Sequence, residues 1–343
     1  MNTITPNSKS ELVNVIIQMF ENNITDLNCI DTSKITDISN LFSIIFEIKS
    51  SYQKNMSIID ISKWNVSNVK NMAHMFDGVK NFNCDISNWD VSNLINGFYM
   101  FYGCKNFTGK GLEKWNLKNC KNMGYMFAGC KKFNCNIGNW NCINVENLTC
   151  TFAGCHKFIG DGIEKWYTPN LKEVDLMFDE CYIFDGNVSG IDISNIKEIH
   201  GMFQCCKKFT GKGVENWNVS NLIKAPYMFS QCTLFNGNLS NWDVSNIKDL
   251  TGMFQYCYKF TGNGLENWNT SSFESLNGTF SNCTSLSCDL SNWNLSNIKI
   301  VSYVFYECKK LDFDISKWNI EKFTLDKRFE AIKGSKLKIK DKI

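Results

Sequence analysis

The sequence predicts a repeat solenoid, in which similar short coils stack to form one α/β domain. Three observations predict this fold. All ten tryptophans fall into one register, whose steps alternate between 25 and 26 residues. A phenylalanine lies twelve residues after each register position from Trp64 to Trp293, and an aliphatic residue lies three residues before every one. The phrase WDVSNLINGFYMFYGCKNF, which begins at Trp89, returns almost unchanged at Trp242.

The tryptophan register defines the coils. Ile191 fills the one place where a tryptophan is missing, and a degenerate coil with Ile30 in that place extends the array to about twelve coils. The 26-residue steps carry one extra residue, as in FTGKGLEKW, whereas the 25-residue steps read like FNCDISNW. A unit of two coils therefore alternates along the chain. Its register positions are Trp64, Trp89, Trp115, Trp140, Trp166, Ile191, Trp217, Trp242, Trp268, Trp293 and Trp318.

Each coil is expected to contain one strand and one short helical segment. Apolar residues follow each tryptophan in steps of three and four, as over 69–79, and this spacing is typical of a helix. Ser67 and Asn68 precede that segment and suit an N-cap. The β-branched, partly alternating stretch before each tryptophan, such as 85–91, predicts a short strand. Stacked strands would form a parallel sheet on one face.

The ends of a stack of coils need caps. Residues 1–24 are interpreted as an N-terminal helical cap, because 10–20 have helical periodicity and a serine N-cap. Residues 25–322 form the repeat solenoid, with an insertion at about 43–57 that is expected to bulge as a loop. Residues 323–343 are interpreted as a C-terminal cap and basic tail, in which Phe323, Leu325, Phe329 and Ile332 would cover the last coil.

The phrases Met100-Phe101-Tyr-Gly-Cys104-Lys-Asn-Phe107 and Phe82-Asn-Cys-Asp-Ile-Ser-Asn-Trp89-Asp-Val-Ser-Asn93 carry a family resemblance over about residues 25–322. The chain resembles the BspA-like repeat family, also known as a domain of unknown function abundant in mycoplasma lipoproteins. This resemblance implies a leucine-rich-repeat-like solenoid. Members occur on bacterial surfaces, in some protists and in large DNA viruses, and surface members are thought to bind host proteins or extracellular matrix.

Composition argues for some locations and against others. The formal net charge is only +2, so no nucleic-acid partner is expected. No run of 18 apolar residues exists, and the first residues do not resemble a signal peptide, so no membrane span or export is expected. The 17 cysteines are an odd number and are expected to be reduced. The expectation is a cytoplasmic protein, or a virus-encoded one in the host cytoplasm or the virion.

Three columns of the repeat allow two interpretations each. The cysteines fifteen residues after the register form a metal or disulfide ladder, or are small buried hydrophobes; no CxxC pair supports a metal. The tryptophans form an exposed aromatic stripe or a core ladder. The asparagines four residues after the register bind a ligand or hydrogen-bond the backbone at turns. The second interpretation is preferred in each case.

Function is predicted as protein–protein interaction on an extended solenoid face, with no catalytic, cofactor or metal residue. No Ser/His/Asp or Cys/His constellation and no phosphate-binding glycine loop supports an enzyme. The alternatives are a structural or assembly protein that self-associates, for example in a large virus particle, and a surface adhesin that binds host protein or glycan. The expected partner-binding row comes directly before the tryptophans: Ser87, Asn88, Glu113, Lys114, Glu164, Lys165, Glu215, Asn216, Glu266 and Asn267.

Overall fold

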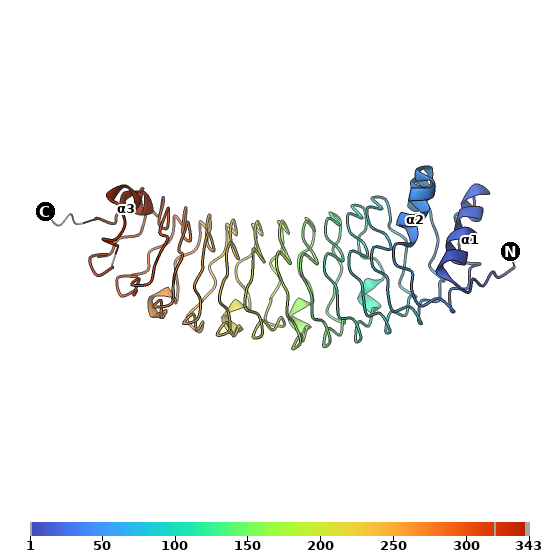
Figure 1. Ribbon diagram of the computed structural model, residues 1–343, viewed down its shortest axis with the longest axis horizontal. Helices are drawn as coiled ribbons and strands as arrows, with labels where there is room; N and C mark the ends of the chain where they lie inside the picture. Colours follow the sequence, from blue (N-terminus) through green and yellow to red (C-terminus); the bar gives the residue numbers. More distant parts are fainter. Residues whose placement is uncertain (1, 319, 340–343) are drawn as a thin grey trace. The chain divides into compact units, whose positions relative to one another are not determined.

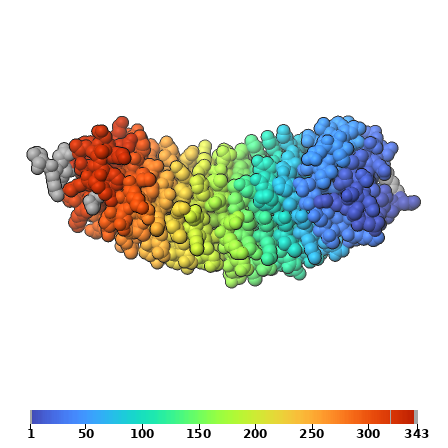
Figure 2. Space-filling view, viewed as in Figure 1, coloured from blue at the N-terminus to red at the C-terminus, as the bar shows by residue number. Residues whose placement is uncertain are grey.

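The computed structural model describes residues 2–318 and 320–339 and divides into two compact units, 1–171 and 172–343. Each unit is a stack of coils that follow one another in chain order (Figures 1 and 2). The helices of the first unit are α1 (Lys9–Glu21), α2 (Leu41–Ile48) and the 3-10 helices η1 (Ser50–Ser57), η2 (Leu112–Lys114) and η3 (Ile163–Lys165). The second unit has η4 (Val214–Asn216), η5 (Leu265–Asn267) and α3 (Leu325–Ile332).

The sheet is reduced to single parallel bridges between neighbouring coils, and the described residues contain no longer strand. Apart from Ile4–Ile30 and Asp26–Asp60 near the N-terminus, the bridges join residues seven places after the register. In the first unit they link Asp37, Asn71, Asn96, Asn122 and Asn147. In the second unit they link Glu198, Lys224, Asp249, Ser275 and Ile300. The bridges are parallel, as expected, but those at this position lie after each tryptophan and not before it.

The strand expected over 85–91 is wrong, because local turns hold this stretch. The Asp85 carboxylate accepts a hydrogen bond from the Ser87 backbone N–H at 3.0 Å, and Asp90 accepts one from Ser92 at 3.0 Å. The backbone N–H of Trp89 donates to the Ile86 carbonyl at 3.2 Å. Such side-chain turns compete with sheet formation, because they satisfy the backbone groups that a strand would offer to its neighbours.

The helical segment expected over 69–79 is also wrong. Alternate N–H groups leave the coil: Met72, His74 and Phe76 donate to the carbonyls of Asn96, Phe98 and Met100 in the next coil at 2.8–2.9 Å. Tight turns lie between them, and the backbone of His74 is left-handed, with a φ of 57°. Consecutive tight turns reproduce the three-and-four spacing of a helix without its internal hydrogen bonds.

The core is a set of aromatic ladders. Phenylalanines twelve places after the register stack ring on ring: Phe76, Phe101 and Phe127 lie 5.4 Å apart at interplanar angles of 8–9°. In the second unit Phe254, Phe280 and Phe305 lie 5.5 Å apart. All of these rings are fully buried. Each coil therefore buries its rings only against its neighbours, so no coil forms a core alone.

The tryptophans belong to this core, as predicted. Every tryptophan is 1–6% exposed. Each indole N–H donates to the carbonyl of the aliphatic residue in the preceding coil, as Trp89 does to Ile61 at 3.1 Å and Trp242 to Val214 at 2.9 Å. The side chain thus contributes apolar area and also satisfies a buried donor. An exposed aromatic stripe at this column is excluded.

The asparagine column hydrogen-bonds the backbone, as predicted. The Asn93 side-chain N–H group donates to the Ser67 carbonyl, Asn119 to Ser92 and Asn246 to Ser220, each at 2.8 Å. Asn68 does the same to Ser33, so the helix N-cap suggested for Ser67 and Asn68 is wrong. These amides tie each turn to the turn of the preceding coil.

Helices lie at the two ends of the chain. Helix α1 begins at Lys9, where the Ser8 hydroxyl caps the Glu11 N–H, and it buries an apolar face that includes Leu12, Ile16 and Phe20. The insertion at 43–57 is not a loop: α2 and η1 occupy it, because Ile45, Phe46, Tyr52 and Met56 are apolar enough to be buried.

At the other end, Ala331 and Lys333 accept the N–H bonds of Phe305 and Glu307, where a further coil would otherwise be needed. Ile332 is buried there, whereas Leu325 and Phe329 are half exposed and do not cover the coil as expected. Residues 1, 319 and 340–343, which belong to the expected cap, solenoid and tail, lie outside the described part of the chain.

Candidate functional site

The row expected to bind a partner lies at the corner of the coils before each tryptophan. The 26-residue coils place it on η2–η5, and the 25-residue coils place it in a turn, as at Ser87 and Asn88. The side chains that are exposed are Asn88, Lys114, Glu164, Lys165, Asn216, Glu266 and Asn267, whereas Ser87, Glu113 and Glu215 are half buried. Nothing in this geometry tests binding, so the row stays a prediction.

Three glutamates of this row have a structural task. The Glu113 carboxylate accepts a hydrogen bond from the Gly111 N–H, Glu215 from Gly213 and Glu266 from Gly264, at 3.0–3.1 Å. Each glycine precedes a short 3-10 helix and has a φ of 90–94°, so the carboxylate closes the corner of the coil. A variant that changes these glutamates would alter the corner as well as the surface.

A second face carries most of the tyrosines. Nine of the 11 tyrosines lie 10, 13, 14 or 16 places after the register: Tyr99, Tyr102, Tyr125, Tyr182, Tyr227, Tyr256, Tyr258, Tyr303 and Tyr306. The positions 10 and 14 places after the register are left-handed in most coils, which turns their side chains outward from the core. We call the surface at positions 9–16 after the register the tyrosine face. The clustering of the tyrosines at these register positions is the sequence signal that could have indicated this face.

In the first unit the tyrosine face is a continuous aromatic stack. The rings of His74 and Tyr99 lie 4.8 Å apart, and those of Tyr99 and Tyr125 lie 4.5 Å apart, at interplanar angles of 13° and 17°. Phe98 packs edge-on against Tyr99 at 4.6 Å, and Tyr102 is 40% exposed beside it. A hydrogen bond to Cys150 raises the pKa of Tyr125, so the phenol stays neutral and offers a hydroxyl.

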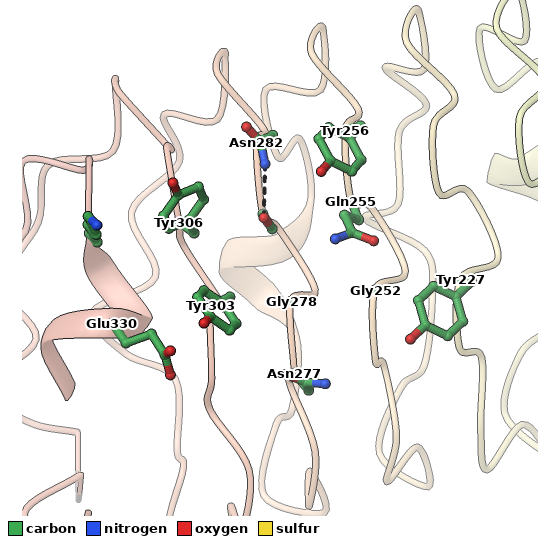
Figure 3. A pocket seen from close by; sticks show the side chains of 12 residues that line it. Tyr227, Gly252, Gln255, Tyr256, Asn277, Gly278, Asn282, Tyr303, Tyr306 and Glu330 are labelled. Carbon is green, nitrogen blue, oxygen red and sulfur yellow. Dashed lines mark hydrogen bonds between the residues drawn. The ribbon is translucent and has the colours of Figure 1, made fainter. Parts of the chain in front are cut away.

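In the second unit the same face contains a pocket of about 620 Å³ (Figure 3). Tyr227 lies on one side of it and Tyr303 on the other, with Gly252 and Gly278 between them. The hydrogen bond and negative charge of Glu330, on α3, raise the pKa of Tyr303. Helix α3 therefore closes one side of the pocket.

The cysteine column is buried, as predicted, and is part of the backbone network. The thiol of Cys104 donates to the Phe76 carbonyl at 3.1 Å, and Cys257 does the same to Phe229. Burial raises the pKa of both thiols, which keeps them protonated. No disulfide joins the cysteines, and no group of three metal-ligating side chains comes together in residues 2–318 and 320–339.

Asp179 is a carboxylate with a raised pKa. Burial, aided by the charge of Glu180, raises the pKa of Asp179 to about 6, and its Oδ1 has no hydrogen-bond partner. A carboxyl group whose folded pKa exceeds its unfolded value of 3.8 binds its proton more tightly in the folded state. Its contribution to stability is present at low pH and is lost as the pH rises from about 4 to about 6.

We expect Asp179→Asn to raise the free energy of unfolding at pH 7 by about 1–2 kcal/mol, because the neutral amide avoids the cost of a half-buried charge. Urea unfolding at pH 7 and pH 4 measures this difference. At pH 4 the wild-type carboxyl is protonated in the folded state, so the two proteins should there differ much less. A variant that is no more stable than wild type at pH 7 would contradict the prediction.

Stacked 25- and 26-residue coils, closed by inter-coil ladders, define a leucine-rich-repeat-like protein. Residues 10–136, 121–242, 187–266 and 224–340 match the family described as "Mycoplasma protein of unknown function, DUF285". The chain belongs to this family, as its repeat phrases indicated. No curated protein matches the chain. None of the helices in the described ranges is both long and apolar enough to cross a bilayer.

Solved structures that the chain resembles include leucine-rich repeat proteins of bacteria. One from Eubacterium ventriosum is 14% identical, with a TM-score of 0.42, and the match covers 100% of this chain and 91% of that one. One from Bacteroides ovatus is 13% identical, with a TM-score of 0.27, over 92% of this chain and 88% of that one. A cell surface protein from Faecalibacterium prausnitzii is 14% identical, with a TM-score of 0.23, over 64% and 76%.

Proposed function

We propose that this protein is a non-enzymatic scaffold that binds a protein partner through the tyrosine face. The observation that supports it is the half-exposed stack of His74, Tyr99 and Tyr125, flanked by Phe98 and Tyr102. Tyrosine rings offer a large rigid area and a hydroxyl, and tyrosine is enriched among the residues that dominate binding energy. The stack already holds these rings in place, so binding costs little side-chain entropy.

The row before each tryptophan remains the second candidate surface. Lys114 and Lys165 are exposed, and their side chains have no part in the glycine corners that the glutamates close. Solenoids use such repeated rows for recognition. A location inside a cell stays a prediction from the sequence.

The two surfaces can be separated with matched double variants of the full chain. Tyr99→Asn with Tyr102→Asn removes the exposed rings, and asparagine tolerates the left-handed backbone of Tyr99. Lys114→Ser with Lys165→Ser alters the other row in the same unit. Both variants should melt like wild type before they are compared in affinity capture under reducing conditions, with quantitative binding of any partner found.

We expect the tyrosine variant to lose the partner by roughly 30-fold or more in affinity, the size of a binding hot spot. The lysine variant should bind like wild type. Loss in the lysine variant alone would assign binding to the row before the tryptophans. Capture of the chain only by itself would instead favour a structural or assembly role.

A further inference from the structure

The pocket in the second unit arises where the tyrosine ladder is interrupted. In the first unit the tenth residue after the register is His74, Tyr99 and Tyr125, whose rings stack, and then Cys150. In the second unit the same column reads Leu176, Gly201, Tyr227, Gly252, Gly278 and Tyr303. Two consecutive glycines thus separate two tyrosines, over three coil steps or about 14 Å at roughly 4.8 Å a step.

The two glycines play different parts. A Cβ on Gly252 would collide with the Tyr227 ring, so this glycine lets that ring lie over the neighbouring coil. A Cβ on Gly278 would meet nothing nearer than the Gln255 Nε2 at 4.0 Å. The empty place in the ladder is therefore above Gly278, between the rings of Tyr227 and Tyr303 (Figure 3).

The groups that line this space are mostly neutral and polar. Gln255, Asn277 and Asn282 bring amides, and Tyr256 and Tyr306 bring hydroxyls. Each amide offers both donors and an acceptor. Glu330 and Lys333 add one negative and one positive charge, which balance each other. The lining side chains include no aliphatic one, so an apolar ligand would gain little here.

We propose that this pocket binds a short neutral oligosaccharide, with one pyranose ring in the place of the missing tyrosine at Gly278. A pyranose has an apolar C–H face, which suits the rings of Tyr227 and Tyr303, and a polar edge of hydroxyls that both donate and accept. The amides of Gln255, Asn277 and Asn282 match that edge. The volume of about 620 Å³ exceeds the space of one ring and lies in the range of small-molecule sites.

Two other ligand classes fit less well. An anion such as a phosphate would meet one cation, Lys333, with the Glu330 carboxylate lining the same space. An aromatic side chain of a protein would fill the gap between the tyrosines but would offer no hydrogen bond to the Gln255 and Asn277 amides, which costs binding energy; the Asn282 amide already donates to the Ser281 hydroxyl at 3.0 Å. A sugar ring can pack its apolar face against the tyrosine rings and hydrogen-bond the amides through its hydroxyls. This small-ligand site is separate from the protein-binding surface proposed for the first unit.

The structure supplies a substitution that fills the pocket without straining the backbone. Gly278 has a φ of 62°, and the same column holds Tyr227 and Tyr303 at 57° and 55°. Gly278→Tyr should therefore fold, and its ring should fill the space between the rings of Tyr227 and Tyr303. Leu176→Tyr is the matched control, since it places a tyrosine at φ 52° in the same column, over Gly201 and four coils before Gly278. Equal melting temperatures would confirm that both variants are folded.

Binding is measured on the full chain by saturation-transfer NMR and calorimetry, with maltotriose, cellotriose, tri-N-acetylchitotriose and N-acetyltyrosinamide as probes. We expect at least one trisaccharide to bind wild type and Leu176→Tyr equally, and Gly278→Tyr to bind it roughly tenfold or more weakly. The proposal is overturned if none of the trisaccharides binds wild type, or if Gly278→Tyr binds as well as wild type. Binding of N-acetyltyrosinamide alone would also overturn it, in favour of an aromatic side chain.

Discussion

Gly264→Ala is expected to lower the free energy of unfolding by about 3–5 kcal/mol, from backbone strain together with a collision that no side chain can relieve. Gly264 has a φ of 94°, and an added Cβ would run into the backbone nitrogen of Ser240 and lie 2.6 Å from its Cα. Both atoms belong to the neighbouring coil, whose backbone is itself fixed by Asx turns and ladders. The coil corner would have to open.

Gly278→Ala is the matched control for this substitution. Its φ of 62° is also left-handed, but an added Cβ would meet open space. Alanine there should cost about 1 kcal/mol, the strain of the left-handed region alone. Urea unfolding of wild type and both variants measures the difference. If the two variants lose similar amounts of unfolding free energy, the collision between coils at the corner adds nothing to the strain of the left-handed backbone.

Trp242→Ala is expected to cost about 3–5 kcal/mol, the usual loss when a large aromatic side chain leaves a cavity in a core. Trp242 is 4% exposed, lies 6.5 Å from the ring of Trp217 and 6.4 Å from that of Trp268, and donates to the Val214 carbonyl. The alanine variant loses the ring contacts on both sides and the hydrogen bond.

Trp242→Ile separates these contributions, because Ile191 shows that isoleucine is accepted at a register position, where it is 1% exposed. Isoleucine fills part of the volume but cannot donate a hydrogen bond. In chemical unfolding monitored by circular dichroism, the free energy of unfolding of Trp242→Ile should lie between those of wild type and Trp242→Ala. If isoleucine and alanine are equally destabilising, the hydrogen bond and stacking outweigh the filled volume.

The sequence predicted best those features that every coil repeats. The burial of the phenylalanine, tryptophan and cysteine columns followed from their regular spacing, and so did the backbone role of asparagines such as Asn93. A residue that returns in every coil faces the same neighbours each time. Its environment can be inferred without knowing the path of the backbone in between.

The path of the backbone was harder to predict. Apolar steps of three and four suit an α-helix and also suit consecutive tight turns, so the spacing over 69–79 could not separate them. The left-handed residues were partly hidden as well, because His74, Tyr99 and Cys150 occupy a column in which glycine, the usual sign of a positive φ, occurs only in some coils of the second unit. By contrast, the Asp85–Ser87 turn was visible in the sequence as Asp-x-Ser and argued against a strand there.

The candidate surfaces depended on this path. The row before each tryptophan could be named from the sequence, but the capping of Gly111 by Glu113 could not, because it needs the left-handed corner. The pocket was even harder to predict from the sequence. Gly252 and Gly278 acquire meaning only once their column is known to face outward beside the rings of Tyr227 and Tyr303.

The alternation of long and short coils limits how such a chain can change its length during evolution. In each long coil a glycine corner lies against the backbone of the short coil before it: Gly111 against Ser87, Gly162 against Gly138 and Gly264 against Ser240. Duplicating or deleting two coils together keeps every such pairing. Changing the number by one within the array would bring two corners of the same kind together, as occurs in this chain only at its last coils, where Trp293 and Trp318 both end 25-residue steps. Relatives of different length should therefore differ by about 51 residues, or multiples of that number, in their repeat arrays.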